Sequence, residues 1–148
     1  MERGGLGLAL AVTLAFAFAG CKPDVAALDR TDLQSALAAD ATLDEALTKA
    51  DEAERARLDD DAANILKRAH PDADRAVSQA EALSPRSPWG KKERDALVAL
   101  EHDRKDELDR YEKALRSGDL DEKLTALKKQ LELERRAKAI AEEVARGP

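Results

Sequence analysis

The sequence predicts an all-α protein of four to five helices that ends in a long antiparallel helical hairpin. Apolar residues recur at spacings of three and four along most of the chain, and helix start and stop signals separate these runs. No stretch alternates with the period of two that is typical of strands. Alanine is abundant whereas large apolar side chains are sparse, so closely packed helices are favoured over a globule with a thick core.

The start and stop signals predict helices over about residues 32–39, 43–69, 72–83, 88–116 and 120–145. Capping boxes at 31–34 (TDLQ) and 42–45 (TLDE) begin the first two, because a threonine accepts from the third amide while Gln or Glu reaches back. Pro71 is expected to end the second helix, since proline lacks an amide hydrogen and clashes with the preceding turn. Asp72 is expected to cap the third helix. Residues 25–83 therefore form an acidic helical half within one domain, 25–148.

Residues 84–90 (SPRSPWG) are predicted to be the loop that joins the two halves, since both prolines follow a serine. Ser87 before Pro88 suits the start of a helix with proline at its first position. Trp89 is the one large ring in this loop, and its role has two open interpretations. The ring either fills the junction between the halves or is presented to a protein partner, as interface aromatics often are.

Residues 91–146 are predicted to form the hairpin. Gly118 can take the left-handed conformation that ends a helix, and Asp119 with Glu122 can cap the next one. Two helices of about 26 residues, roughly 39 Å each, with so short a connection lie antiparallel. The apolar lines expected to face each other are Leu97, Leu100, Leu108, Tyr111 and Leu115 on the first helix and Leu120, Leu124, Leu127 and Leu131 on the second.

Charged residues of the hairpin follow an acid-then-base order at a spacing of four, which stabilises isolated helices. We interpret them as a solvated face that supports helices with a thin core, the alternative being a charged docking surface. The pairs are Glu101–Lys105, Asp106–Arg110, Asp109–Lys113, Glu112–Arg116, Asp119–Lys123, Glu132–Arg136, Glu134–Lys138 and Glu142–Arg146.

Residues 1–20 have the layout of a secretory signal. The uncharged run from Leu6 to Phe18 is shorter than the roughly 20 apolar residues of a membrane-spanning helix, and Ala19-Gly20 supply small residues for cleavage. The single cysteine, Cys21, follows directly. From the residues alone, Cys21 is a lipid attachment site, an ordinary residue of a signal cut elsewhere, or a free thiol packed in a core.

The stretch Phe18-Ala19-Gly20-Cys21 resembles the lipobox of bacterial membrane lipoproteins. This resemblance implies that the signal is cut before Cys21 and that the cysteine carries a diacylglyceryl lipid, with residues 21–24 as a short tether. Lys22 does not match the aspartate that retains many such proteins at the inner membrane of enteric bacteria. The resemblance therefore implies attachment to the outer membrane, facing the periplasm.

Residues 22–90 hold 9 Lys+Arg and 15 Asp+Glu, whereas residues 91–148 hold 15 of each. Neither half has the basic excess that binds nucleic acid, and an acidic half disfavours anionic lipid. Membrane contact is therefore expected through the lipid on Cys21. No metal or cofactor is expected, because His70 and His102 lack the ligand partners of a zinc site and the acidic run at 59–61 lacks a calcium loop.

No nucleophile elbow, phosphate-binding loop or tuned acid–base pair stands out, so we expect a protein that is not an enzyme. The function expected is that of a lipid-anchored cell-envelope lipoprotein whose helical domain is a non-catalytic interaction or scaffolding module with a protein partner. The alternative is an inhibitor or chaperone of a secreted or periplasmic protein, which acts through residues 84–90 or the acidic half.

Overall fold

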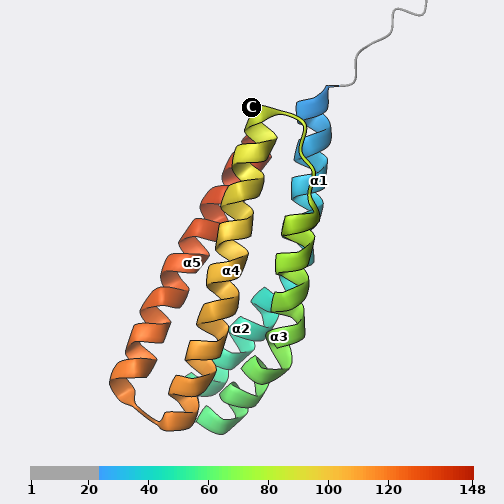
Figure 1. Cartoon of the computed structure of the whole chain (residues 1–148). Coiled ribbons are helices and arrows are strands. Elements are labelled where there is room, and N and C mark those ends of the chain that lie inside the picture. Colours follow the sequence, from blue (N-terminus) through green and yellow to red (C-terminus); the bar gives the residue numbers. More distant parts are fainter. Residues whose placement is uncertain (1–23) are drawn as a thin grey trace, which may run out of the picture.

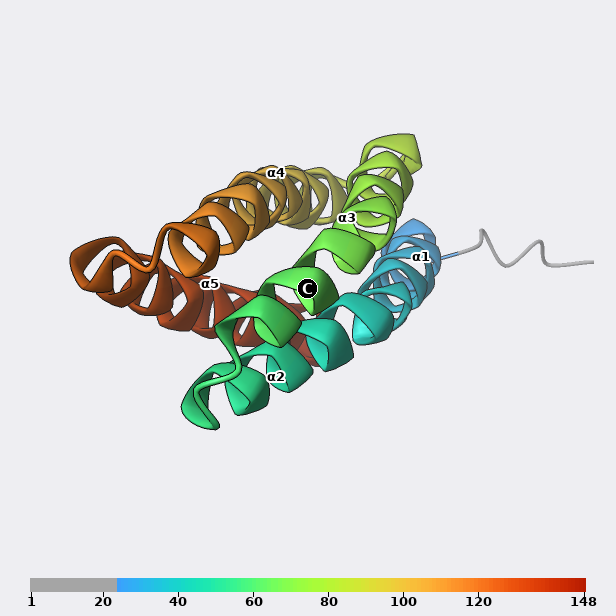
Figure 2. The ribbon, with the colours of Figure 1, turned by 90° about the horizontal axis from the view of Figure 1, so that it is seen from below.

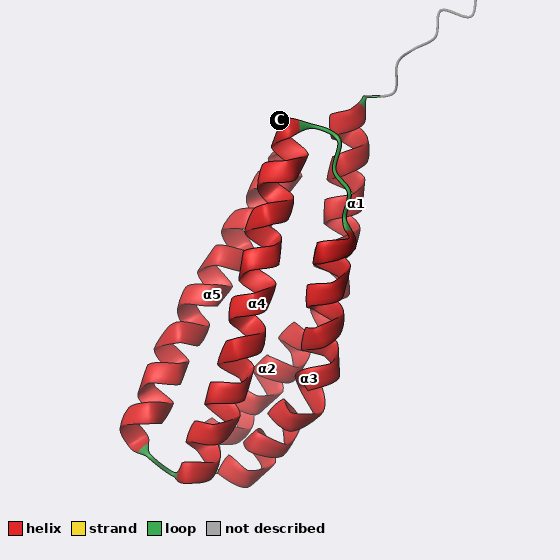
Figure 3. Ribbon diagram, viewed as in Figure 1, coloured by secondary structure: helices red, strands yellow, loops and turns green. Residues whose placement is uncertain are grey.

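The computed structural model describes residues 24–148, and every regular element in this range is a helix (Figure 1, Figure 3). The helices are α1 (Val25–Ala39), α2 (Ala41–Arg55), α3 (Asp59–Ala82), α4 (Pro88–Ser117) and α5 (Leu120–Arg146). The predicted all-α fold with a C-terminal antiparallel hairpin is confirmed. The expected signal, residues 1–20, and the expected lipid site, Cys21, lie outside the described residues.

The α4–α5 hairpin runs the length of the molecule, and the first three helices cover it unequally (Figure 1, Figure 2). α3 packs along α4, and α2 packs on α3. α1 contacts α3, α4 and α5 near the end of the bundle that holds the C-terminus. α2 makes no backbone contact with α4 or α5, so a space remains between α2 and the hairpin.

The helix ends around the hairpin match the sequence signals. Ser87 caps α4, where its side chain accepts a hydrogen bond from the amide of Gly90 and Pro88 occupies the first turn. Gly118 ends α4 with a φ of 72°, a conformation that glycine adopts at little cost. Asp119 caps α5 by accepting from the amides of Asp121 and Glu122. Side chains that act within three residues are readable from the sequence, which explains this agreement.

Both predicted capping boxes in the first half are wrong. α1 begins at Val25, because the carboxylate of Asp24 accepts from the amides of Ala26 and Ala27. Thr31 lies inside α1, where its hydroxyl donates to the carbonyl of Ala27. α2 does begin near the expected place, but Thr42 lies within its first turn and makes no cap. Asp24, seven residues before Thr31, determines where α1 begins, because a helix that starts there gains about two turns over one that starts at Thr31.

The sequence predicts that the second helix ends at Pro71. The break between α2 and α3 falls instead at residues 56–58. Asp59, Asp60 and Asp61 occupy the first turn of α3, where the partial positive charge of a helix N-terminus stabilises carboxylates. Within a continuous helix the same three charges would repel one another. Arg57, with a φ of 61°, makes the turn.

α3 continues through Pro71 to Ala82, so Asp72 does not cap a new helix. Pro71 is exposed, whereas Ala69 and Ala73 on either side of it are buried. Burial of that alanine face against the bundle offsets the hydrogen bond that proline removes. Tertiary packing therefore overrides the local preference of proline for a helix end.

The core consists of two clusters of buried residues, one toward each end of the bundle. The lower cluster, nearer the turn between α4 and α5, contains Leu43, Ala50, Ala62, Ala63, Leu66, Ala69, Ala73, Leu108, Tyr111, Leu115 and Ala126. The upper cluster contains Leu33, Ala36, Ala80, Leu97, Leu100, Leu133, Ile140 and Val144. The many alanines let α3 approach its neighbours closely, which suits a chain with few large apolar side chains.

Of the apolar line predicted for the first part of α5, Leu127 packs against the lower cluster, but the other three leucines do not face α4. Leu120, Leu124 and Leu131 are 68%, 45% and 54% exposed. The buried face of α5 instead carries Ala126, Leu133, Ile140 and Val144. Three of these four belong to the upper cluster, so packing against α1 and α4 at that end sets the rotation of the whole rigid helix.

Asp29 of α1 ties the loop at residues 84–87 to the bundle. Its buried carboxylate accepts hydrogen bonds from the amide of Arg86 (2.9 Å), the amide of Ser87 (2.7 Å) and the hydroxyl of Ser87 (2.6 Å). Burial alone would raise the pKa of Asp29, but these hydrogen bonds outweigh it and lower the pKa below its usual range. A Cβ at Gly90 would overlap this carboxylate, so glycine is needed there.

Asp29→Ala leaves three donors unpaired and is expected to lower the free energy of unfolding by about 1–3 kcal/mol, measured by urea denaturation. Asp32→Ala, on an exposed position of the same helix, is the control and is expected to change stability by less than about 0.5 kcal/mol. Equal effects of the two substitutions would show that Asp29 does not anchor the loop.

Candidate functional site

Several charged side chains are buried, contrary to the expectation that the carboxylates face solvent. They are Asp29, Asp40, Glu93, Glu101, Arg104 and Glu107. Of the acid–base pairs predicted at a spacing of four, Asp109–Lys113 and Glu112–Arg116 form in the predicted order.

Other members of the predicted pairs bond across helices. Lys105 pairs with Asp74 of α3 at 2.6 Å. Lys123 of α5 pairs with Asp59 of α3, and Arg136 of α5 pairs with Asp103 of α4. Neighbouring helices bring carboxylates within reach that the sequence spacing does not reveal, so many charges link helices rather than support single ones.

A polar layer separates the two apolar clusters. It consists of Asp40 at the α1–α2 junction, Asp44 of α2, and Glu101 and Arg104 of α4. The guanidinium of Arg104 lies 3.7 Å from Asp40 and 3.5 Å from Glu101, and it also bonds to Asp44. Asp40, Glu101 and Arg104 are only 5%, 1% and 8% exposed. One buried cation thus faces three carboxylates from three chain segments.

Burial and charge make Asp40 and Glu101 a pair that holds a proton. Burial raises the pKa of Asp40 to about 7, with repulsion from Glu101 adding to it and Arg104 opposing it. Burial also raises the pKa of Glu101. Among the described residues, Oε2 of Glu101 has no hydrogen-bond donor unless the carboxyl of Asp40 is protonated and donates to it. One shared proton therefore satisfies both groups.

A groove lies over this layer, between α2 and α5. Its upper part holds about 500 Å³ and has Arg104 on its floor. Asp40, Asp44, Leu47 and Thr48 line one wall, and the α5 wall carries Gln130, Leu133, Glu134, Ala137, Lys138 and Ala141. The groove exists because the backbone of α2 lies close to α3 but to neither helix of the hairpin.

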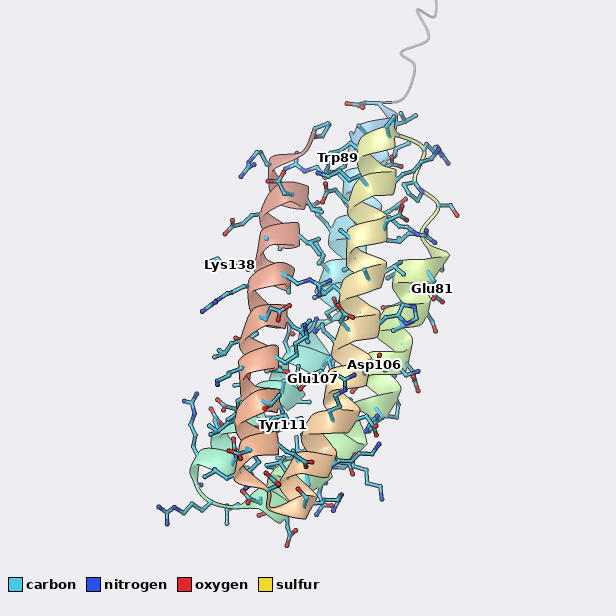
Figure 4. All side chains as sticks on the ribbon, turned by 60° about the vertical axis from the view of Figure 1, so that its left-hand side comes forward. Glu81, Trp89, Asp106, Glu107, Tyr111 and Lys138 are labelled. Carbon is cyan, nitrogen blue, oxygen red and sulfur yellow. The ribbon has the colours of Figure 1, made fainter. Side chains whose placement is uncertain are left out.

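The lower part of the groove holds about 510 Å³ and shares Leu47, Thr48, Gln130 and Glu134 with the upper part. Its floor is Tyr111, whose hydroxyl donates to Glu54 at 2.9 Å; Figure 4 shows Tyr111 on α4. Burial is the main cause that raises the pKa of this phenol, and the hydrogen bond to Glu54 and the charge of Glu54 raise it further. The walls add Asp51 and Arg55 from α2 and Leu127 and Leu131 from α5.

The groove therefore combines apolar walls with an acidic rim. Leu47, Leu127 and Leu131 offer apolar surface, while Asp51, Glu54 and Glu134 place carboxylates along its length. An elongated channel of this composition suits an amphipathic helix better than a compact ligand. The polar layer joins α4 to α2 through Arg104 and Asp44 and so fixes the position of α2, on which the shape of the groove depends.

Trp89, the residue that the sequence singled out as a possible partner contact, does not line the groove. Its ring is half-buried and packs against the upper cluster, and Figure 4 shows it at the opposite end of α4 from Tyr111. His70 bonds to Glu112 at 3.0 Å and His102 to Glu81 at 2.9 Å. Within residues 24–148 no group of three His, Cys, Asp or Glu side chains is arranged to hold a metal ion.

The sequence contained one signal for the polar layer. Glu101 and Arg104 interrupt the apolar line of α4 between Leu100 and Leu108, at positions that share the face of that line. Charged residues on a buried face require buried partners. The identity of those partners, Asp40 and Asp44, depends on how α2 is placed and could not be read from the spacing.

No family model, curated protein or solved structure matches the chain. Among the helices of residues 24–148, none is both long and apolar enough to cross a membrane.

Arg104→Met is expected to lower the free energy of unfolding by about 3–5 kcal/mol, because it leaves Asp40 and Glu101 buried without a cation. Lys91→Met is the control, since Lys91 lies at an exposed position of the same helix. Its effect is expected to stay within about 0.5 kcal/mol. Urea denaturation of both variants measures the difference, and an equally mild effect at Arg104 would contradict the role of the polar layer.

The shared proton makes stability depend on pH in a defined direction. The pKa of Asp40 rises from 3.8 to about 7 on folding, so the folded state binds more protons between these values. The free energy of unfolding is therefore expected to fall as pH rises from about 4 to 7. Asp40→Asn keeps a neutral donor to Glu101 and is expected to flatten this decline, which urea midpoints at several pH values would measure. An unchanged slope would show that Asp40 is already ionised.

Proposed function

We propose that the protein is a lipid-anchored lipoprotein of the bacterial cell envelope whose helical domain is a non-catalytic interaction module. The lipid is attached at Cys21, and the domain faces the periplasm from the outer membrane. The groove between α2 and α5 is its contact surface. The observation that carries the interaction role is the groove with exposed leucines on its α5 lip.

The anchoring half of the proposal rests on the N-terminal sequence. Phe18-Ala19-Gly20-Cys21 resembles a lipobox, and the uncharged run before it is too short to remain as a spanning helix. α1 begins at Val25, so only three residues separate Cys21 from the helical domain. A lipid at Cys21 would hold the upper end of the bundle close to the membrane and leave the lower groove facing away.

The interaction half rests on surface chemistry. Leu120, Leu124 and Leu131 of α5 are exposed although α5 already has a buried apolar face. Exposed apolar residues grouped on one helix beside a groove are typical of protein-binding surfaces. Of the buried carboxyl pair, Asp40 lines the upper part of the groove, and Arg104 lies 3.7 Å from Asp40 and 3.5 Å from Glu101. The pair therefore supports the position of α2 beside the groove.

Cys21→Ser is expected to abolish incorporation of labelled palmitate and to release the protein from membranes into the soluble fraction. Each buried methylene contributes about 0.8 kcal/mol, so two or three chains account for the whole attachment. Ser35→Ala, at an exposed position of α1, is the control and is expected to keep both label and membrane attachment. Membrane retention of an unlabelled Cys21→Ser protein would overturn the anchor.

A further inference from the structure

Four leucines of α5 form a seam that the monomer leaves largely open. Leu120, Leu124 and Leu131 are 68%, 45% and 54% exposed. Leu127 lies between them and packs partly against the lower cluster. Successive spacings of four, three and four residues are those of the a and d positions in a coiled coil.

Apart from Leu127, which packs partly against the lower cluster, this seam is separate from the face with which α5 joins its own bundle. The buried face carries Ala126, Leu133, Ile140 and Val144. A helix with apolar residues on two faces has more apolar surface than one packing partner can cover. Figure 2 shows α5 at the edge of the bundle, where its outer side is open to a second molecule.

We propose that α5 pairs in antiparallel orientation with α5 of a second copy of this chain, through Leu120, Leu124, Leu127 and Leu131. By their spacing, Leu124 and Leu131 occupy a positions, and Leu120 and Leu127 occupy d positions. In an antiparallel pair each a position packs against a d position, so Leu124 meets Leu127 of the second copy and Leu120 meets Leu131. The arrangement has twofold symmetry, so both molecules contribute the same surface and each covers the leucines of the other.

The charges beside the seam select both the partner and the orientation. Asp121 and Lys128 flank it on one side, and Lys123 and Gln130 on the other. An antiparallel pair sets Asp121 opposite Lys128 of the second copy, twice by symmetry, and Lys123 opposite Gln130. A parallel pair would instead set Lys123 opposite Lys128 and would lack both Asp121–Lys128 contacts. The seam is therefore complementary to itself in one orientation.

Asp121 and Lys128, the two charges that attract each other across this pair, are free to form it. Lys123 and Lys129 pair with Asp59 and Glu132 of their own chain. Neither Asp121 nor Lys128 forms an ion pair with another described residue. Such exposed pairs add little affinity, so they orient the helices while the leucines supply the association.

The seam also continues the groove. Leu127 and Leu131 line its lower part, so a second α5 placed on the seam lies along the lip of that groove. The inference rests on the interaction role proposed above and names the second copy as the partner. It does not depend on the lipid, so the two proposals can fail separately.

Disulfide formation between single-cysteine variants tests the pairing. Full-length Asp121→Cys and Lys128→Cys, each with Cys21→Ser so that no other thiol is present, are given different tags, mixed and oxidised. The antiparallel pair is expected to give a disulfide in the mixture and none with either variant alone. Two identical positions lie about 10 Å apart along the axis of such a pair, beyond the Cα separation of about 7 Å that a disulfide spans.

Several results would overturn the proposal. Absence of the mixed disulfide would exclude the pair, and a disulfide from Lys123→Cys mixed with Lys128→Cys would show a parallel one. Cross-links to other proteins instead of to the second copy would identify a different partner.

The molar mass of the Cys21→Ser protein by light scattering provides an independent measurement. It is expected to be that of a dimer, and Leu124→Asp is expected to weaken association by at least about tenfold, because each dimer then buries two charges. Ala139→Asp, at an exposed position of α5 outside the seam, is the matched control and is expected to leave the dimer intact. A monomeric parent protein, or equal weakening by both substitutions, would contradict the seam.

Discussion

The distance between α2 and the α4–α5 hairpin is the constraint on which the rest of the structure depends. The backbone of α2 lies close to α3 and α1 but to neither hairpin helix, and the alanines of the core are too short to fill the remaining space. Long polar side chains cross it instead: Arg104 reaches Asp44, and Tyr111 reaches Glu54. These contacts hold α2 away from α5, and the groove is the space that they leave.

The polar contacts between α2 and α4 place ionisable groups where an apolar core would normally lie. Asp40 and Glu101 are tolerated between the two apolar clusters because Arg104 neutralises part of their charge and a shared proton removes more of it. A buried ionic group of this kind contributes little net stability compared with a well-packed apolar layer. It does fix one relative position of α2 and α4, since Arg104 of α4 bonds to Asp44 of α2 and lies 3.7 Å from Asp40.

The small number of large apolar side chains in the chain also explains which residues of α5 are buried. Its large side chains from Leu133 to Val144 fill the upper cluster, whereas near the turn the small Ala126 faces the core and the leucines turn outward. The rigid helix cannot bury both faces within one chain. The proposed lipid on Cys21 would leave this seam and the adjoining groove at the free end of the bundle, where other molecules can reach them.

The sequence by itself determined the fold class, the hairpin and the ends of its helices, because Ser87, Gly118 and Asp119 act on backbone atoms within three residues of themselves. Only the tertiary structure decided that Pro71 lies inside a helix, since burial of Ala69 and Ala73 outweighs a local preference. It also decided which charges meet and which leucines stay exposed. Ion-pair partners and buried faces depend on the placement of other helices, and that information is not local to any stretch of the chain.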